Sequence, residues 1–453
     1  MVDLQYLSAL AERTVSMATH AGADRCDVVA ADTDTISVDL EKGSVKQANI
    51  FSDPGVGVRA FVKGASGFAV CTGFDDAAVS RAAAMAVSLA RAGTPDKDFK
   101  DLPVARQVRM LPGLYEPKVA EIGPDEVVSM VIEMSDIAGD HKKVTSSNAS
   151  AAVSVCQVAL ANSNSFSSAQ RMTSVDLVVE SVARDGDAMF SGYDGCSGRR
   201  LEQGTIERVS TTARDQAVKG LVQTKLETGD YAIIMDPLAA GFVLGNAIGG
   251  GLNADSVQRG RSFLAGKLGQ VIGSPAVTVY DDPTIEWASG STSFDGEGVT
   301  AARSTLVDKG RLASYLYDSY AAGKESRAST GNSSRGGSVW SYRHPPSIST
   351  TNLVVSPGDS SFDEMVRETR SGAYVRATFD YPNLATGEFS GLMMESYVIR
   401  DGELGPAIRQ STMGIGIVDM LSRVDMVGKK PRDYFGVQTP PFRISSARIA
   451  GSG

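Results

Sequence analysis

Stretches in which apolar and polar residues alternate, joined by glycine-containing turns, recur along the first part of the chain. Ile36, Val38 and Leu40 alternate with polar residues, a Glu-Lys-Gly turn follows at residues 41–43, and the alternation returns over residues 56–62. A period of two places successive side chains on opposite faces of an extended strand. This feature constrains the fold most strongly, because it requires strands that pair through tight turns and bury one face.

Helical patterns alternate with these strands. Helices are predicted near residues 4–18, 79–89, 124–139 and 203–220, where apolar residues recur every three or four positions. Asp75 or Asp76 can cap the second of these helices, and Asp3 the first. Further strands are predicted near residues 153–160 and 175–182. Residues 1–220 are therefore predicted to form an N-terminal α+β domain, in which helices cover an antiparallel sheet.

The second half of the chain has a different pattern. A strand-like apolar run at residues 231–235 leads to an Asp-Pro pair at residues 236–237, a typical helix start. We expect this helix to dissolve at residues 249–251, where three glycines follow one another. Short apolar stretches separated by turns come next, and Asp-Gly at residues 401–402 predicts a hairpin. Residues 221–453 are therefore predicted to form a C-terminal β-rich domain that resembles a sandwich or barrel.

Composition narrows the possible functions. The 453 residues are 42% hydrophobic and 21% charged, as in an ordinary globular protein, with a formal net charge of −9. Nucleic-acid binding depends on basic side chains that neutralise phosphates, so we expect no nucleic-acid partner. The apolar runs are far shorter than the roughly 20 residues of a membrane span, and the first residues carry no apolar signal sequence. Together with four widely spaced cysteines, these features predict a cytoplasmic protein that contacts no membrane.

Common catalytic motifs are absent or out of place. Residues 55–60 match Gly-x-Gly-x-x-Ala, but the alternation that follows places these glycines in a strand or bulge instead of before a nucleotide-binding helix. The sequence contains no Gly-x-x-x-x-Gly-Lys-Ser/Thr phosphate loop and no Gly-x-Ser-x-Gly elbow. Cys196 lies in a predicted turn and would need one of three distant histidines as its base, so we expect a structural thiol.

Metal ligands are scarce as well. The chain contains three histidines: His20, His141 and His344. They lie far apart in the sequence, and we expect each of them to be structural or solvated. Two acidic pairs could bind Mg²⁺ or Ca²⁺: residues 281–282, and Asp295 with Glu297. The Asp-Gly sequence at residue 295 nevertheless favours a turn.

Several blocks of sequence occur in the same order as in one known family. In the second half they are residues 241–255 (GFVLGNAIGGGLNAD), 261–264, 268–269, 294–299, 309–312, 329–332, 403–408 and 425–428. In the first half they are residues 41–43 and 55–59. Through this ordered set the chain resembles the TldD/PmbA family, whose members are often labelled modulators of DNA gyrase.

The resemblance also singles out one branch of that family. In the TldD branch the corresponding helix bears His-Glu-x-x-x-His, and a cysteine near the C-terminus completes a metal site in which the glutamate is the general base. Here the histidine positions fall on Gly245 and Gly250, the glutamate position falls on Asn246, and no cysteine follows Cys196. Glycine has no donor atom and asparagine is not a base. The chain therefore resembles the metal-free PmbA branch, also called TldE, which implies no metal, no cofactor and no catalytic residue.

The PmbA branch implies a role and partners. A PmbA-like chain acts as a heterodimer with a TldD-like, metal-bearing homologue and helps to enclose short or unfolded peptides. We therefore expect a non-catalytic pseudo-enzyme that is inactive alone and forms a homodimer when the partner is absent. Two alternatives stay open. One is a homodimeric protein that binds peptides or metabolites, and the other is a metal-free enzyme that uses the same cavity for other chemistry.

A glycine-rich groove is the predicted peptide site. Gly249, Gly250 and Gly251 lack side chains and let another backbone approach, so an extended peptide could pair along them. Polar contacts are expected from Asn246, Asn253, Asn332 and Arg335. Alternatively, the glycines end a helix and pack against a neighbouring strand, and the sequence favours neither interpretation.

Overall fold

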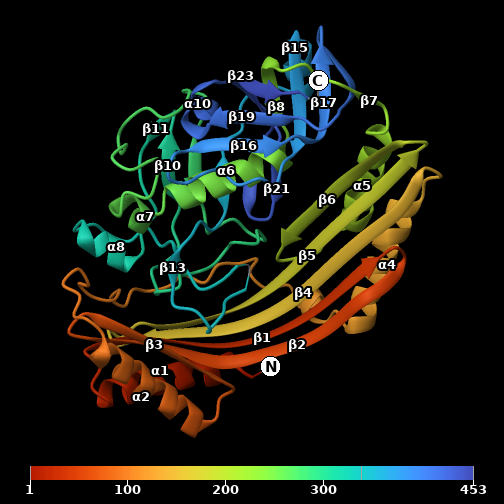
Figure 1. Cartoon of the computed structure of the whole chain (residues 1–453). Helices are drawn as coiled ribbons and strands as arrows, with labels where there is room; N and C mark the ends of the chain where they lie inside the picture. The colour runs from red at the N-terminus through yellow and green to blue at the C-terminus, as the bar shows by residue number, and fades with distance from the viewer. Residues whose placement is uncertain (1, 338, 452–453) are drawn as a thin grey trace.

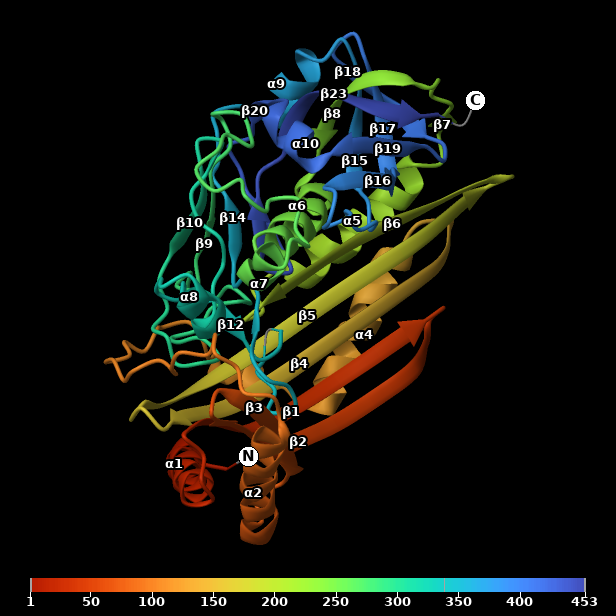
Figure 2. The same cartoon turned by 60° about the vertical axis from the view of Figure 1, so that its left-hand side comes forward.

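The computed structural model of the chain describes residues 2–337 and 339–451. It has the α+β architecture predicted from the sequence, with an antiparallel sheet and helices in the first half and β-rich sheets in the second. Figures 1 and 2 show the second half packed onto the side of the first sheet that is opposite α1 and α2. Val29 and Cys156 from the sheet share a buried core with Phe294 and Trp340, which joins the two halves.

The first sheet contains six strands in the order β3-β2-β1-β4-β5-β6, and every neighbouring pair is antiparallel. The strands are β1 (Arg25–Glu41), β2 (Ser44–Val62), β3 (Ala65–Thr72), β4 (Val144–Asn162), β5 (Ser167–Asp185) and β6 (Ala188–Gly198). Gly55 and Gly57 lie inside β2, opposite Ala31 and Val29 of β1. The prediction that these glycines belong to a strand is confirmed.

Five helices accompany this sheet in the described part of the first half. They are α1 (Leu4–His20), α2 (Asp76–Ala92), α3 (Pro117–Ala120), α4 (Pro124–Gly139) and α5 (Thr205–Lys219). Figure 1 shows α1 and α2 at one end of the sheet and α4 and α5 towards the other. The Asp75 carboxylate caps α2 by accepting a hydrogen bond from the Ala78 amide at 2.9 Å. Asp3 stands at the start of α1 but makes no side-chain capping bond.

A nine-stranded sheet forms the largest part of the second half. Its strands are β7 (Gln223–Thr224), β8 (Gly229–Met235), β15 (Ser371–Ala377), β16 (Glu388–Leu392), β17 (Met394–Arg400), β18 (Glu403–Ile408), β19 (Thr412–Gly416), β20 (Val424–Val427) and β23 (Phe442–Ala450). Asp401 and Gly402 join β17 to β18 with φ angles of 48° and 82°. These positive angles are typical of a two-residue hairpin turn, so the predicted hairpin is confirmed.

A six-stranded sheet and a two-stranded ribbon complete the second half. The sheet contains β9 (Val279–Asp281), β10 (Ser304–Asp308), β11 (Arg311–Leu312), β14 (Leu353–Val355), β21 (Arg432–Tyr434) and β22 (Val437–Thr439), and the ribbon pairs β12 (Ser333–Ser334) with β13 (Ser347–Ile348). The helices are α6 (Pro237–Gly251), α7 (Ala254–Gln258), α8 (Ser319–Lys324), α9 (Phe362–Arg367) and α10 (Ile417–Ser422). Of these helices α6 is the longest, and Figure 2 shows it above β5 and β6.

Tertiary packing holds α6 together. Asp236 caps its start by accepting a hydrogen bond from the Leu238 amide at 2.9 Å. Val243, Leu244 and Ile248 are at most 1% exposed, because they pack into the main core of the second half. The helix continues through Gly251, so the prediction that it dissolves at residues 249–251 was wrong. Burial of its apolar side chains compensates for the low helix propensity of glycine.

Cys196 lies in β6, where it pairs with Leu177 of β5, and not in the predicted turn. The glycines beside it suggest a turn locally, but the neighbouring strand supplies backbone partners that keep this segment extended. Burial raises the pKa of the Cys196 thiol to about 11, which favours the unreactive thiol form.

Within residues 2–337 and 339–451, no helix is long and apolar enough to cross a membrane. The strands of the first sheet end at Gly198, and the strands of the second half begin at Gln223. The division of the chain into domains of residues 1–220 and 221–453 stays a prediction.

Candidate functional site

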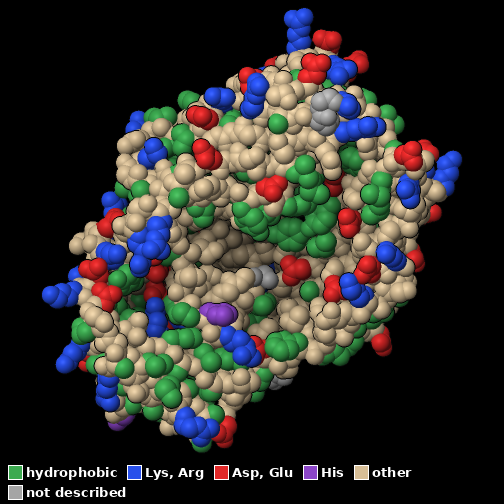
Figure 3. All heavy atoms as spheres, in the orientation of Figure 1, with side chains coloured by type: hydrophobic (Ala, Val, Ile, Leu, Met, Phe, Trp, Pro, Cys, Tyr) green, Lys and Arg blue, Asp and Glu red, His purple; other side chains and the backbone are tan. Residues whose placement is uncertain are grey.

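A cavity of about 580 Å³ lies where α6 faces the first sheet. Its walls come from β5 and β6, from α6, from the β21–β22 hairpin, from residues 289–295, 332–337 and 349–351, and from Trp340 and Phe379. Figure 3 shows a hollow near the centre of this face of the molecule, below a patch of apolar side chains. The volume falls within the range of roughly 300–1,000 Å³ that is typical of ligand pockets.

Six aromatic side chains contribute to the cavity lining and are together called the aromatic wall. They are Tyr193, Phe242, Trp340, Phe379, Tyr434 and Phe435. The Phe379 ring meets Tyr193 and Phe242 edge to face, with centroid distances of 5.3 and 5.5 Å. Phe435 occupies the turn of the β21–β22 hairpin with a φ of 52° and is 46% exposed. Bulky residues rarely adopt positive φ, so the fold holds this ring at the cavity against its backbone preference.

The turn that follows Phe294 supplies a buried carboxyl group to the cavity. Asp295 is 2% exposed and accepts hydrogen bonds from the backbone amides of Glu297 at 3.0 Å, Val299 at 2.8 Å and Ser333 at 3.1 Å. Burial and, second, the charge of Glu297 raise the pKa of Asp295 above its usual value. The bonds to Glu297 and Val299 confirm the turn predicted from the Asp-Gly sequence.

Asn332 and Ser333 present buried polar atoms beside Asp295. The Asn332 side-chain nitrogen donates to Asp281 at 2.7 Å and to the Ser349 carbonyl at 3.1 Å. The Asn332 oxygen Oδ1 and the Ser333 hydroxyl have no hydrogen-bond partner among the described residues, although these residues are only 2% and 4% exposed. Buried polar groups almost always have partners in folded proteins. These two atoms, in residues that line the cavity, are therefore exceptions to that rule.

The α6 wall does not provide a metal site. Gly245 and Asn246 line the cavity, whereas Gly250 does not. A Cβ atom at Gly245 would lie 2.9 Å from Val437 Cγ2, and one at Gly250 would lie 2.5 Å from Leu384 Cδ1, so histidines at these positions would displace their neighbours. Two glycines and one amide cannot supply the three or four ligands of a catalytic zinc ion. The residues present therefore do not fit the metal that a metallopeptidase of the TldD type would hold here.

The acidic pairs have other roles. Asp281 accepts hydrogen bonds from the Thr351 amide and hydroxyl, both at 2.8 Å, and Asp282 accepts from the Thr284 amide at 2.9 Å. Within the residues that the structure describes, no three His, Cys, Asp or Glu side chains gather closely enough to hold a metal ion. His20 lies in the last turn of α1, where its Nδ1 is 2.7 Å from the Ser16 carbonyl.

The remaining predicted groove residues do not meet in the cavity. Those outside its lining are Gly249, Gly250, Gly251, Asn253 and Arg335. A Cβ atom at Gly251 would lie 2.7 Å from the Phe263 ring, so this glycine permits close packing inside the protein. Asn253 caps α7 by accepting a hydrogen bond from the Ser256 amide at 3.2 Å. Of the predicted site residues, the structure brings together Gly245, Asn246 and Asn332.

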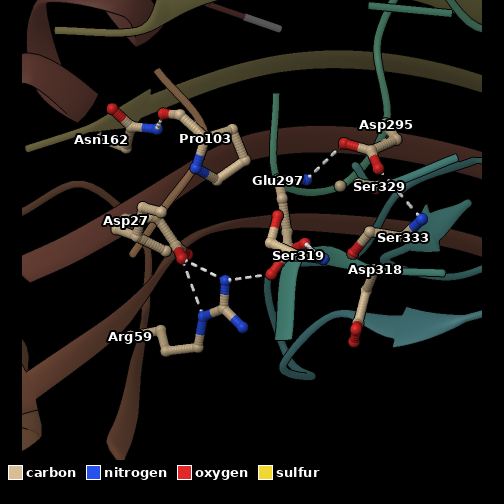
Figure 4. A network of polar contacts seen from close by, with 12 residues as sticks. Asp27, Arg59, Pro103, Asn162, Asp295, Glu297, Asp318, Ser319, Ser329 and Ser333 are labelled. Carbon is tan, nitrogen blue, oxygen red and sulfur yellow. Dashed lines mark hydrogen bonds and ion pairs between the residues drawn. The ribbon is translucent and has the colours of Figure 1, made fainter. Parts of the chain in front are cut away.

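Arg335 belongs to a buried ion-pair network that joins the two halves of the chain. It pairs with Asp27 of β1. Arg59 of β2 donates to Asp27 at 2.7 Å and to Glu297 at 2.8 Å, as Figure 4 shows. The side chains of Asp27, Glu297 and Arg335 are at most 2% exposed. Two guanidinium groups balance two carboxylates, so the network ties the first sheet to the turn that carries Asp295.

Several cavity residues escaped the sequence analysis. Asp176 of β5, the Ser333 hydroxyl and the aromatic wall were not identified. Asp176 lies in a predicted strand, but alternation alone does not show which segment covers a strand face. The one local signal for Ser333 was that it directly follows Asn332, a predicted site residue.

The chain was compared with known proteins. Three family models described as PmbA/TldA metallopeptidase domains match it: domain 1 over residues 26–90, the central domain over residues 117–221 and the C-terminal domain over residues 228–451. A metalloprotease of Methanothermobacter thermautotrophicus is 32% identical over 297 residues, which are 62% of this chain and 64% of that relative. A metalloprotease TldD homolog of Haemophilus influenzae is 25% identical over 436 residues, 92% of this chain and 88% of that protein.

The structural comparison agrees with the sequence comparisons. The crystal structure of TldE from Thermococcus kodakarensis has a TM-score of 0.89 to this chain and is 20% identical in sequence. The alignment covers 98% of this chain and 100% of that one. At this identity the similarity shows the fold alone, whereas the three family models cover most of the sequence in order. The chain therefore belongs to the PmbA/TldD metallopeptidase family.

Proposed function

We propose that this chain is a PmbA/TldE-like, non-catalytic subunit that encloses short or unfolded peptides together with a TldD-like, metal-bearing homologue. The observation that carries the proposal is the α6 wall of the cavity, where Gly245 and Asn246 stand in place of a ligand and a general base. The second ligand position, Gly250, faces Leu384 instead of the cavity. A chain with this wall cannot activate a water through a metal at α6, so cleavage by a metal-bound water there has to come from a partner.

The cavity supports a role in holding peptides. Gly337 is part of its lining, and a Cβ atom there would meet no other described residue within 4 Å, which leaves room for another backbone. Its aromatic wall offers apolar surface for side chains, while Asn332 and Ser333 offer unpaired polar atoms. This combination of apolar surface with a few convergent polar groups is typical of sites that bind small molecules or peptides.

Mixing experiments test the proposed role. The purified chain, a TldD-like homologue and their mixture are assayed for cleavage of an unfolded peptide. We expect cleavage by the mixture to exceed the sum of the separate activities, and the chain alone to be inactive. A mixture containing a homologue whose motif glutamate is replaced by glutamine is the control, and it should be inactive. Cleavage by the pure chain that a chelator abolishes would show that the proposal is wrong.

Metal content tests the same proposal without an activity assay. Elemental analysis of the purified chain should find far less than one equivalent of a transition metal, because α6 offers no ligand set. One equivalent that is lost when Asn246 is replaced by alanine would place a metal at α6 and contradict the proposal.

Oligomeric state separates the proposal from its alternative. We expect an isologous homodimer when the partner is absent and a heterodimer when it is present, as measured by light scattering. A homodimer that binds peptides but neither associates with nor stimulates a TldD-like homologue would support the alternative, a peptide- or metabolite-binding protein. A monodisperse monomer would count against both.

A further inference from the structure

The charged side chains that line the cavity have one sign. Its acidic residues are Asp176 from β5 and Asp295 from the second half, and the described lining contains no Lys, Arg or His. The raised pKa of Asp295 weakens its negative charge near neutral pH. The two carboxyl groups come from different halves of the chain, so their convergence is a product of the fold. Such a cavity repels anions and favours ligands with positive charge.

Three arginines behind the walls have carboxylate partners. A fourth, the buried Arg199, donates to the backbone carbonyls of Thr173 at 3.1 Å and Ser291 at 2.9 Å and interacts electrostatically with Asp176. Arg335 pairs with Asp27 within the ion-pair network. Behind the aromatic wall, Arg376 pairs with Glu395, and Arg432 donates to Asp194 at 2.6 Å. The guanidinium groups of Arg335, Arg376 and Arg432 are neutralised within the protein, and none of the four arginines is part of the cavity lining.

Two buried polar atoms beside the cavity have no partner among the described residues and can accept hydrogen bonds. Asn332 directs its nitrogen to Asp281 and Ser349, which leaves the oxygen Oδ1 without a partner. Asn246 donates a hydrogen bond from its side-chain nitrogen to the Phe242 carbonyl, at 2.8 Å. The Ser333 hydroxyl, also without a partner, can accept as well as donate. A ligand that satisfies this set has to bring N–H or O–H donors of its own.

The aromatic wall suits a cation as well as an apolar group. Six aromatic residues contribute to the lining. The face of an aromatic ring carries partial negative charge and attracts ammonium and guanidinium groups. The lining therefore suits an ammonium or guanidinium group better than a carboxylate or a phosphate, because it combines acceptor atoms, carboxyl groups and ring faces.

We propose that the cavity binds an ammonium or guanidinium group carried by a peptide, so that the subunit selects peptides that place a positive charge at this point. The cation would lie among Asp176, Asp295, Asn332 and Ser333, with the aromatic wall beside it. The peptide part of this inference rests on the proposed function. The preference for a cation rests on the cavity alone.

Peptide binding to the purified chain, measured by calorimetry, tests the preference. The neutral reference is Ac-Ala-Ala-Lys-Ala-Ala-NH2 with an acetylated lysine side chain. One probe restores the lysine ammonium, a second carries arginine instead, and a third has a free N-terminus and no basic side chain. A fourth probe carries glutamate. We expect at least one cationic probe to bind about tenfold more tightly than the neutral reference, and the glutamate peptide to bind most weakly.

Substitutions connect the preference to this cavity. Asp176→Asn removes one lining charge at constant size, and Ser333→Ala removes an unpaired hydroxyl, so each should weaken the cationic probe about five- to tenfold. Asp187→Asn is the matched control, because it removes one charge from an exposed turn outside the cavity and should leave binding unchanged. Equal thermal midpoints for all variants would show that the fold is intact.

The outcomes separate this inference from the proposed function. Equal binding of cationic and neutral peptides, tighter binding of the glutamate peptide, or binding that Asp176→Asn leaves unchanged would overturn the inference. The absence of binding by every probe would overturn it as well. If such a chain still stimulates a TldD-like homologue, the proposed function stands without the inference. If the chain prefers cations but stimulates no homologue, the inference holds for a binding protein.

Discussion

Two buried polar regions lie side by side, and the chain alternates between them. Asp295 and Ser333 face the cavity, whereas Glu297 and Arg335, each two residues further along, enter the ion-pair network. In the network every charge has an opposite charge beside it. In the cavity, the Ser333 hydroxyl and the Asn332 oxygen have no partner within the described structure. Burial is similar in both regions, and Arg335 Nη1 of the network also lacks a hydrogen-bond partner among the described residues. The two regions therefore differ in how their charges are paired and not in burial.

The largest expected effect concerns the network. Arg335→Ala leaves Asp27 and Glu297 buried with one guanidinium between them, and should lower the free energy of unfolding by about 3 kcal/mol. Urea unfolding followed by circular dichroism measures this loss. Arg370→Ala is the control, because Arg370 and Asp401 are 95% and 89% exposed, and it should change stability little. Similar losses of unfolding free energy in both variants would show that the buried network contributes no more to stability than an exposed ion pair.

The pH dependence of stability tests a carboxyl group that has no cation partner. Asp281 is 1% exposed, and burial raises its pKa to about 6. In the unfolded chain the pKa of Asp281 is about 4. Between about pH 4 and pH 6 the folded protein therefore binds this proton more tightly than the unfolded chain does. The free energy of unfolding should therefore rise as the pH falls from about 7 to about 4, by at most about 1.4 kcal/mol per pH unit from this group.

A substitution isolates the contribution of Asp281. Asp281→Asn should flatten the dependence of unfolding free energy on pH between 5 and 7, measured by urea unfolding at each pH. Asp401→Asn, at an exposed position, should leave that dependence as it is. An unchanged dependence in Asp281→Asn would show that this carboxyl is not the group responsible.

Two glycines of α6 should respond differently to a methyl group. A Cβ atom at Gly249 would lie 3.5 Å from Thr350 Oγ1, an ordinary contact, so Gly249→Ala should stabilise the protein by about 0.5–1 kcal/mol. At Gly245 the Cβ atom would lie 2.9 Å from Val437, and crowding should cancel that gain. Thermal unfolding of both variants measures the difference, and equal stabilisation would show that Val437 moves aside without cost.

The smallest expected effect is the most specific for the cavity. Ser333→Ala should change the free energy of unfolding by less than about 0.5 kcal/mol, because its hydroxyl has no partner to lose. Ser181→Ala is the matched control, since Ser181 is fully buried and donates to the Ala138 carbonyl at 3.0 Å. It should cost about 1 kcal/mol in the same urea titration. A comparable loss for Ser333→Ala would mean that its hydroxyl supports the fold.

The fold was largely predictable because its signals are local. The helix predicted near residues 124–139 spans Pro124–Gly139, and the hairpin at residues 401–402 has the expected positive φ angles. Both depend on residues close together in sequence. The end of α6 and the strand at Cys196 were not predictable in this way, because packing and a neighbouring strand override glycine preferences there.

The candidate site was predictable only in part. The sequence analysis found the α6 segment and Asn332, and these line the cavity. It grouped Arg335 with them, although that side chain turns to Asp27, which is 308 residues away in the chain. It also missed Asp176. Sequence proximity could not separate Ser333 from Arg335, because neighbouring residues were divided between a cavity and an ion-pair network.

By itself, the sequence determined which chemistry α6 lacks, since glycine has no side-chain donor atom and asparagine is not a general base in any fold. It also determined the alternation of strands and helices, because side-chain periodicity and turn residues act over a few positions. Only the tertiary structure decided which buried polar groups have partners. That outcome depends on contacts between the first sheet and the second half, where two positions along the chain separate a residue of the cavity lining from a paired charge.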